Sequence, residues 1–276
     1  MAAKRKIYRV DGTDAIVDYM KGEKEYLFKE ETMDEHGNVL CLIEFDKKGE
    51  PERRTDATYK GENILTQKIT NLFDDTAEMF EFEYDESQHL VKEYVVYPDE
   101  KLLHQEYEYD DQGNLITITY YDDDEVSHRD CFEYDKKGNL VERAQYNNED
   151  EELEAQMFEY NENGQMVKNI FESPDDDGRF TEDHYNQDIT LYEYDEHGRR
   201  ISEIKPEQNY RTSYLYDDKD KMTEYTGYQM EEVVDKHVIV YDDHDRVAQE
   251  SFFSDRCKNN SGYGGSCDAY TLRYEY

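Results

Sequence analysis

Carboxylates are the most abundant chemically capable side chains in this 276-residue chain, with 70 Asp and Glu against 32 Lys and Arg and a formal net charge of -38. A pair of carboxylates can supply the acid and the base of glycoside hydrolysis. Acidic residues occur throughout the sequence, however, so no pair stands out, and solvated surface charge is their ordinary interpretation. We therefore expect a protein that is not an enzyme and that needs no cofactor or metal.

Three acidic runs are the candidate binding residues. We expect them to lie in loops that contact a basic protein partner, because negative potential attracts cations; solvated loop tips without a partner are the alternative. The same charge repels phosphate backbones and anionic lipids, which argues against direct binding to nucleic acid or a membrane. The runs are Asp122, Asp123 and Asp124; Glu149, Asp150, Glu151 and Glu152; and Asp175, Asp176 and Asp177.

Other motifs that could bind a ligand are incomplete. Residues 175–178 resemble the start of a calcium loop but lack the alternating ligands and the closing Glu. Residues 261–266 are rich in glycine but lack the Lys-Ser/Thr ending of a phosphate loop. His36, His197 and His244 each follow a repeated position by three residues, which is typical of structural turn residues.

The four cysteines fall in unrelated phases of the repeat and have no spacing typical of metal ligands. We expect plain thiols. Cys257 and Cys267 flank the glycine-rich segment and could form a disulfide only in an oxidising compartment. The other two are Cys41 and Cys131.

An internal repeat of about 25 residues must position these side chains. Each unit has an anchor residue, almost always Tyr and usually followed by Asp, then a turn, then an apolar residue. A fixed period of this length is the signature of a repeat architecture. The anchors are Tyr8, Met33, Tyr59, Tyr84, Tyr109, Tyr134, Tyr160, Tyr194, Tyr216, Tyr241 and, in a last partial unit, Tyr276.

Within a unit the residue types alternate, as in Tyr107, Glu108 and Tyr109. A period of two places the rings on one face of a β-strand and the carboxylates on the other. Glycine four residues after the anchor fits the left-handed residue of a tight hairpin turn. The expected turn residues are Gly12, Gly37, Gly113, Gly138, Gly164 and Gly198, with Gln88, Asp220 and Asp245 replacing glycine in other units.

The repeat therefore predicts an all-β fold of tandem antiparallel β-hairpins. We expect one array over residues 1–276, with about ten hairpins and longer insertions near residues 172–188 and 254–268. A flat ribbon of this length could not bury its aromatic face, so the right-handed twist of β-sheets should curl it into a single superhelical, solenoid-like sheet. The insertions map to loops, where repeat proteins often bind partners.

Four segments carry a family resemblance. Residues 82–91, 107–116, 132–141 and 192–201 begin with Phe-Glu-Tyr-Asp or Tyr-Glu-Tyr-Asp and resemble tyrosine-aspartate (YD) repeats, also called Rhs repeats. The resemblance implies a continuous spiralling antiparallel sheet. In large members of that family such sheets form shells around toxin domains, and related surface proteins bind partners or carbohydrate. This chain is short for a closed shell and carries no recognisable toxin domain.

We expect an acidic protein-binding module, most specifically an inhibitor or immunity protein that neutralises a basic toxin or effector, such as a nuclease with its cationic substrate site. A surface or carbohydrate-binding module is the alternative that the resemblance implies. Residues 1–22 contain no apolar run typical of a signal peptide, and no stretch is long and apolar enough to span a membrane. We therefore expect the protein in the cytoplasm.

Overall fold

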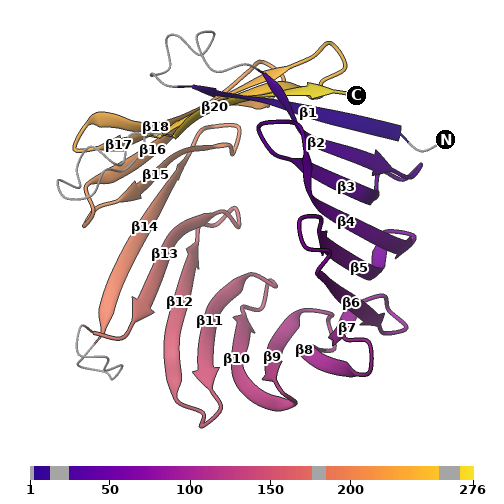
Figure 1. Ribbon diagram of the computed structural model, residues 1–276. Coiled ribbons are helices and arrows are strands. Elements are labelled where there is room, and N and C mark those ends of the chain that lie inside the picture. Colours follow the sequence, from indigo (N-terminus) through magenta and orange to yellow (C-terminus); the bar gives the residue numbers. More distant parts are fainter. Residues whose placement is uncertain (1–2, 13–24, 176–184, 255–267) are drawn as a thin grey trace. The chain divides into compact units, whose positions relative to one another are not determined.

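The computed structural model describes residues 3–12, 25–175, 185–254 and 268–276, which form twenty β-strands and no helix (Figure 1). The strands are β1 (Ala3–Gly12), β2 (Tyr26–Met33), β3 (Val39–Phe45), β4 (Pro51–Lys60), β5 (Asn63–Asn71), β6 (Ala77–Tyr84), β7 (Leu90–Val96), β8 (Lys101–Tyr109), β9 (Leu115–Asp122), β10 (Glu125–Tyr134), β11 (Leu140–Asn147), β12 (Glu152–Tyr160), β13 (Met166–Ser173), β14 (Asn186–Tyr194), β15 (Arg200–Lys205), β16 (Tyr210–Tyr216), β17 (Met222–Gln229), β18 (Glu232–Tyr241), β19 (Val247–Ser254) and β20 (Asp268–Glu275). The all-β prediction is confirmed. None of the described residues forms a helix with the length and apolarity that crossing a membrane requires.

The expected alternation of rings and carboxylates is present. Glu108 and Glu133 are exposed, whereas the anchor rings of Tyr109 and Tyr134 are half-buried on the other face. The core is thin, because one layer of sheet cannot enclose a ring completely. The buried apolar residues among those described are Ile7, Ala57, Ala144, Ala155, Val234 and Ile239.

Six of the anchor tyrosines join neighbouring hairpins through their hydroxyl groups. Tyr134 donates a hydrogen bond to the carbonyl oxygen of Leu115, at the start of the return strand of the preceding hairpin, over 2.9 Å. Each bond satisfies a backbone acceptor and fixes the spacing of successive units. The same link joins Tyr109 to Leu90, Tyr160 to Leu140, Tyr216 to Arg200, Tyr241 to Met222 and Tyr276 to Val247.

The aspartate that follows most anchors closes the turn. The carboxylate of Asp110 accepts the backbone N–H groups of Gln112 and Asn114 at 2.8 and 2.9 Å, which holds the chain in the turn. Asparagine can replace aspartate because its amide oxygen accepts the same bonds. This role is shared by Asp34, Asp46, Asp85, Asp135, Asn147, Asn161, Asp195, Asp217 and Asp242.

The left-handed turn residues are where the repeat predicts them, with one exception. Positive φ angles are found at Gly37, Gly113, Gly138, Gly164, Gly198, Gln88, Asp220 and Asp245. The prediction for Gly12 is wrong, because Gly12 lies in extended strand β1 opposite Ala269. Its anchor, Tyr8, is followed by Arg9 and so lacks the Asp or Asn that closes most of the other turns.

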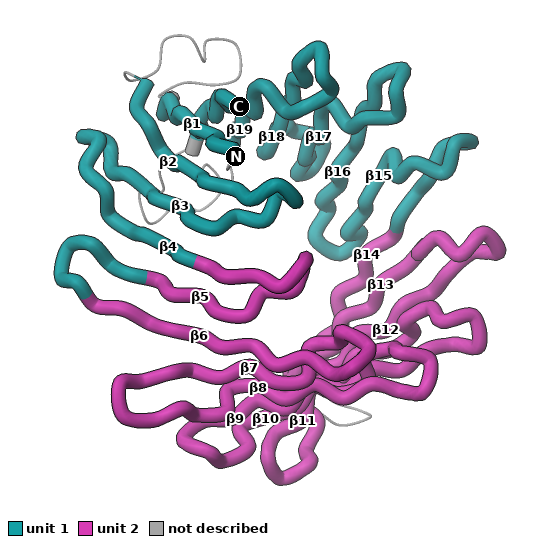
Figure 2. The backbone as a smooth tube through the Cα atoms, turned by 90° about the vertical axis from the view of Figure 1, so that its right-hand side faces the viewer, with its two compact units in different colours: residues 1–56, 70–75, 192–276 teal, residues 57–69, 76–191 magenta. Residues whose placement is uncertain are grey.

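The described residues group into two compact units (Figure 2). Unit 1 comprises Met1–Asp56, Thr70–Asp75 and Tyr192–Tyr276, and unit 2 comprises Ala57–Ile69 and Thr76–Leu191. Within unit 1, β1 pairs antiparallel with β2 on one side and with β20 on the other. The expectation of an open, solenoid-like sheet is therefore wrong at its ends, because the first and last strands are hydrogen-bonded to each other. This pairing satisfies backbone groups that two free edges would expose.

Candidate binding edge

Two of the three predicted acidic runs lie at neighbouring hairpin tips in unit 2. Turns of an antiparallel array alternate between its two edges, so the turns joining β7 to β8, β9 to β10 and β11 to β12 share one edge. The run at residues 122–124 forms the β9–β10 tip, and the run at residues 149–152 forms the β11–β12 tip. Successive tips on one edge are about 10 Å apart, which is two strand spacings. Asp175 follows β13 at this same edge, whereas Asp176 and Asp177 lie outside the described residues.

We define the acidic edge as residues 97–100, 122–125 and 149–152. These three tips carry ten carboxylates and no Lys or Arg, and all ten side chains are exposed. The turns at the opposite edge of unit 2 include Lys60, Lys136 and Lys137. The opposite edge also carries carboxylates, such as Glu86, Asp111 and Glu162, so the two edges differ in that Lys accompanies the carboxylates at the opposite edge.

Sequence reasoning missed the first tip of this edge, which contains Asp99 and Glu100. The signal was available, since tips at this edge fall half a repeat, about thirteen residues, after each anchor. Tyr97 lies in that tip with 51% of its surface exposed. The edge thus presents an aromatic ring beside its carboxylates.

The backbone projects the acidic side chains into solvent. Asp123 and Asp124 have φ angles of 48° and 63°, as in a two-residue hairpin turn. At the next tip, Asn147 accepts the N–H groups of Glu149 and Glu151. Arg129, on β10, forms an ion pair with Asp150 and so steadies this tip against the neighbouring hairpin.

Two carboxylates of unit 2 have raised pKa values: Glu142 on β11, and Glu152, which is both the last residue of the acidic edge and the first of β12. Burial, followed by the negative charges of Glu133 and Glu172, raises the pKa of Glu142. Burial, followed by Glu142 and Glu172, also raises the pKa of Glu152. These carboxylates repel one another, and a cation supplied by a partner would lower that repulsion.

The turn aspartates behave in the opposite way. The hydrogen bonds from the Asn114 side chain and backbone lower the pKa of Asp110, and those from Asn139 lower the pKa of Asp135. The pKa is also lowered at Asp34, Asp85, Asp195 and Asp242.

Acid titration should separate these two groups. A carboxylate with a lowered pKa stabilises the fold fully above its unfolded pKa of about 3.9, and this contribution is lost as the pH falls through the folded pKa. Glu142 and Glu152 have raised pKa values, so their protonation relieves a destabilising charge at higher pH. We expect the urea midpoint to rise as the pH falls from 7 to about 5, and to fall below about pH 4. A midpoint that is constant from pH 7 to pH 3 would contradict this assignment.

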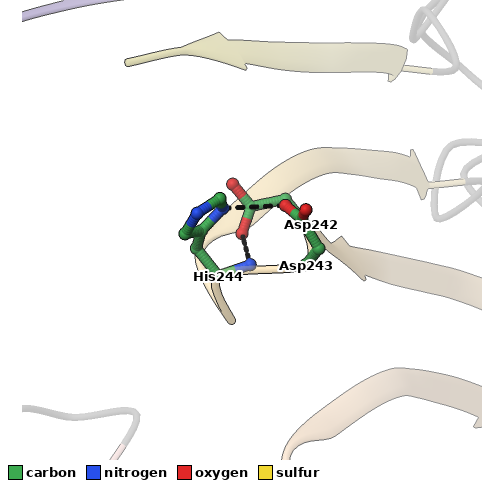
Figure 3. A group of neighbouring side chains, drawn as sticks. All are labelled: Asp242, Asp243 and His244. Carbon is green, nitrogen blue, oxygen red and sulfur yellow. Dashed lines mark hydrogen bonds and ion pairs between the residues drawn. The ribbon is translucent and has the colours of Figure 1, made fainter.

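Asp242, Asp243 and His244 place their ligand atoms within 4.8 Å of one another (Figure 3). The Asp242 carboxylate already accepts the N–H groups of His244 and Arg246 and pairs with the Arg246 side chain. The Nδ1 atom of His244 lies 2.8 Å from Asp243. These contacts explain the group as a closed hairpin turn, in agreement with the interpretation of His244 as a turn residue.

Cys41 and Cys131 are half-buried free thiols, and burial raises the pKa of both. A raised pKa lowers the thiolate fraction, so neither is suited to act as a nucleophile. The predicted insertion near 254–268, with Cys257 and Cys267, lies almost wholly outside the described residues, as does the centre of the insertion near 172–188.

The unit that recurs through both parts of the chain is an anchor tyrosine linked to the preceding hairpin and an aspartate that closes the turn. A family model described as Teneurin YD-shell matches residues 44–254. The chain belongs to the Teneurin YD-shell family. The resemblance to YD repeats is thereby confirmed, and the tyrosine and aspartate of this YD-shell chain have the structural roles described above.

No curated protein sequence matches this YD-shell chain. Among solved structures, the crystal structure of TcdB2-TccC3-Cdc42 contains a chain that is 10% identical with a TM-score of 0.27, covering 91% of this chain and 19% of that chain. This chain thus spans about a fifth of that protein. A porin-like protein from Bacteroides uniformis is 10% identical with a TM-score of 0.42, covering 99% of this chain and 97% of that one. A porin-like protein from Bacteroides vulgatus is 10% identical with a TM-score of 0.29, covering 98% and 97%.

Proposed function

We propose that this YD-shell chain is a non-enzymatic, cytoplasmic protein-binding module that captures a basic protein at its acidic edge. The observation that carries the proposal is the presence of ten exposed carboxylates, without Lys or Arg, on three neighbouring hairpin tips of unit 2. A surface with charge of one sign accelerates encounter with an oppositely charged partner and selects against like-charged partners. The rigid hairpins supply a fixed spacing for those charges.

The aromatic component of the edge supports the same function. Exposed Tyr97 adjoins Asp99 and Glu100 in the β7–β8 tip. Tyrosine often anchors protein interfaces, and its ring attracts Lys and Arg side chains. We propose that the partner is a cationic toxin or effector and that the chain acts as its inhibitor or immunity protein. A nuclease fits this role, because an acidic surface can occupy its cationic nucleic-acid site.

Two variants with the same net charge test the proposal. The edge variant removes four carboxylates from the acidic edge, and the control variant removes four exposed carboxylates at or near the opposite edge. The edge variant is Asp122→Asn, Asp124→Asn, Glu149→Gln and Glu151→Gln; the control is Glu86→Gln, Glu108→Gln, Asp111→Asn and Glu162→Gln.

Binding of a basic nuclease domain and of a fluorescent Lys/Arg-rich peptide is measured by fluorescence anisotropy in low salt. We expect the edge variant to bind at least about tenfold more weakly than the original chain, and the control variant to change by less than about threefold. Binding by the original chain should vanish at about 1 M salt, where the Debye length is about 3 Å. Equal losses in both variants, or binding unchanged by salt, would refute capture at the acidic edge.

A further inference from the structure

Strand β1 is a basic strand in an acidic protein. Lys4, Arg5, Lys6 and Arg9 lie within its ten residues. The strand fills a slot between β2 and β20, with seven residues paired on each side (Figure 1). The slot therefore satisfies both hydrogen-bonding edges of an extended segment.

On the β2 side, cations of β1 meet carboxylates that the slot supplies. Arg5 Nε lies 2.5 Å from Glu31 Oε2, and Glu31 is only 8% exposed. Lys4 Nζ lies 3.2 Å from Glu30 Oε1, but its side chain is 64% exposed. Exposed ion pairs contribute little, whereas a buried carboxylate that loses its only cation is costly. Arg5 is therefore the cation that the slot selects most strongly.

On the β20 side, the contacts combine aromatic rings with charge. The Arg9 guanidinium lies 4.3 Å from the Tyr270 ring centre, and the Arg273 guanidinium lies 4.4 Å from the Tyr8 ring centre. The Tyr8 hydroxyl donates to Glu275 over 3.0 Å. These contacts require an arginine and a tyrosine at neighbouring positions of the inserted strand.

Hydrophobic burial has a small share in holding β1. Among the β1 residues whose burial the structure describes, Ile7 is the one apolar residue that is buried, at 6% exposure. Backbone pairing and ion pairs hold the rest of the strand, and strand addition of this kind is a known mode of peptide binding. Such contacts can be remade by another segment with the same charges, and salt weakens the ionic part.

We propose that β2 and β20 form a receptor slot for a basic extended segment, with β1 as its resident ligand, and that a matching segment supplied in trans can replace β1. The ligand carries cations at the positions of Arg5 and Arg9, an apolar side chain at that of Ile7 and tyrosine at that of Tyr8. This inference does not rest on the proposed function, because no residue of the slot belongs to the acidic edge.

Peptide exchange tests the slot directly. A protease site is introduced between residues 13 and 24 of the full chain, so that cleavage leaves β1 in place but no longer covalently attached. The cleaved protein is mixed with a fluorescent peptide of residues 1–12. We expect one labelled peptide per chain, released at high salt. A peptide with Arg5→Gln should bind at least about tenfold more weakly, while the matched Lys4→Gln peptide should change by less than about threefold.

Absence of uptake by a folded cleaved protein, or equal binding of the two substituted peptides, would overturn the proposal. If cleavage unfolds the protein, hydrogen exchange on the uncleaved chain decides instead. At 1 M salt the β1 amides should exchange at least about tenfold faster than at 50 mM, while those of β10 and β11 stay unchanged. Equal acceleration in all three strands would overturn the inference.

Discussion

Replacing Asp130 with alanine is expected to lower the free energy of unfolding by about 3 kcal/mol. The residue is 2% exposed, on the ring-bearing face of β10. Its carboxylate accepts Arg143 at 2.9 Å, the Gln145 amide at 3.1 Å and the Tyr120 hydroxyl at 3.3 Å. Removing it leaves three donors without their acceptor. The loss falls at the lower end of the range for broken buried pairs because the Arg143 side chain is 36% exposed and can recruit water.

The matched variants separate charge from shape. Asp130→Asn keeps one acceptor and the side-chain volume, so about half of the loss should remain. The double variant Asp130→Leu/Arg143→Met removes both partners and should be more stable than Asp130→Ala. The measurement is urea unfolding by linear extrapolation. A loss below about 1 kcal/mol for Asp130→Ala would show that the network does not hold β9, β10 and β11 together.

The hairpins were predictable because each repeat contains the residues that determine its strands and its turn. Alternating rings and carboxylates define the faces of a strand, and Asp followed by a left-handed residue defines the turn. Both signals are local, so the sequence contains them within about ten residues, as at Tyr109 to Gly113. Where the local signal is incomplete, the prediction fails: Tyr8 lacks its following Asp, and Gly12 is extended.

The pairing of the first and last strands was not predictable from local signals. Tyr8 and Glu275 form a hydrogen bond across 267 positions of sequence. Twist predicts that a long sheet curls, but not that its ends meet in register. The charge of β1 indicates only that the strand has acidic neighbours, because four cations in ten residues of an acidic chain attract nearby carboxylates.

The buried carboxylates could not be distinguished in the sequence from the many exposed ones. Asp130 and Asp235 are two among 70 acidic residues, and nothing near them in sequence distinguishes them from solvated ones. Their burial depends on partners in neighbouring strands, such as Gln145 opposite Asp130. The acidic edge is an intermediate case. Its runs were visible in the sequence, but their common edge follows only from the strand pairing.

Replacing Gly227 with alanine tests the surroundings of Asp235, the second buried carboxylate. The substitution is expected to lower the free energy of unfolding by about 3 kcal/mol. A Cβ atom at this β17 position would lie 2.3 Å from the Tyr210 hydroxyl oxygen and 3.2 Å from Asp235 Cβ. The Tyr210 hydroxyl donates to Asp235, which is 4% exposed and also accepts Ser254 at 2.6 Å. The added methyl group must push the ring away, so the buried carboxylate loses a donor as well as its close packing.

The substitution Tyr210→Phe provides the decisive control, because it removes the hydroxyl that the new methyl group would strike. In the Gly227→Ala/Tyr210→Phe variant the losses in the free energy of unfolding should not add. The loss in the double variant should be smaller than the sum of the two single losses by about 1 kcal/mol or more. Gly138→Ala should lower the free energy of unfolding by about 1–2 kcal/mol, because the φ angle of Gly138 is +83°. No collision adds to this loss, since no atom lies within 4 Å of an added Cβ. Strict additivity of Gly227→Ala and Tyr210→Phe would show that the collision with Tyr210 is not what requires glycine here.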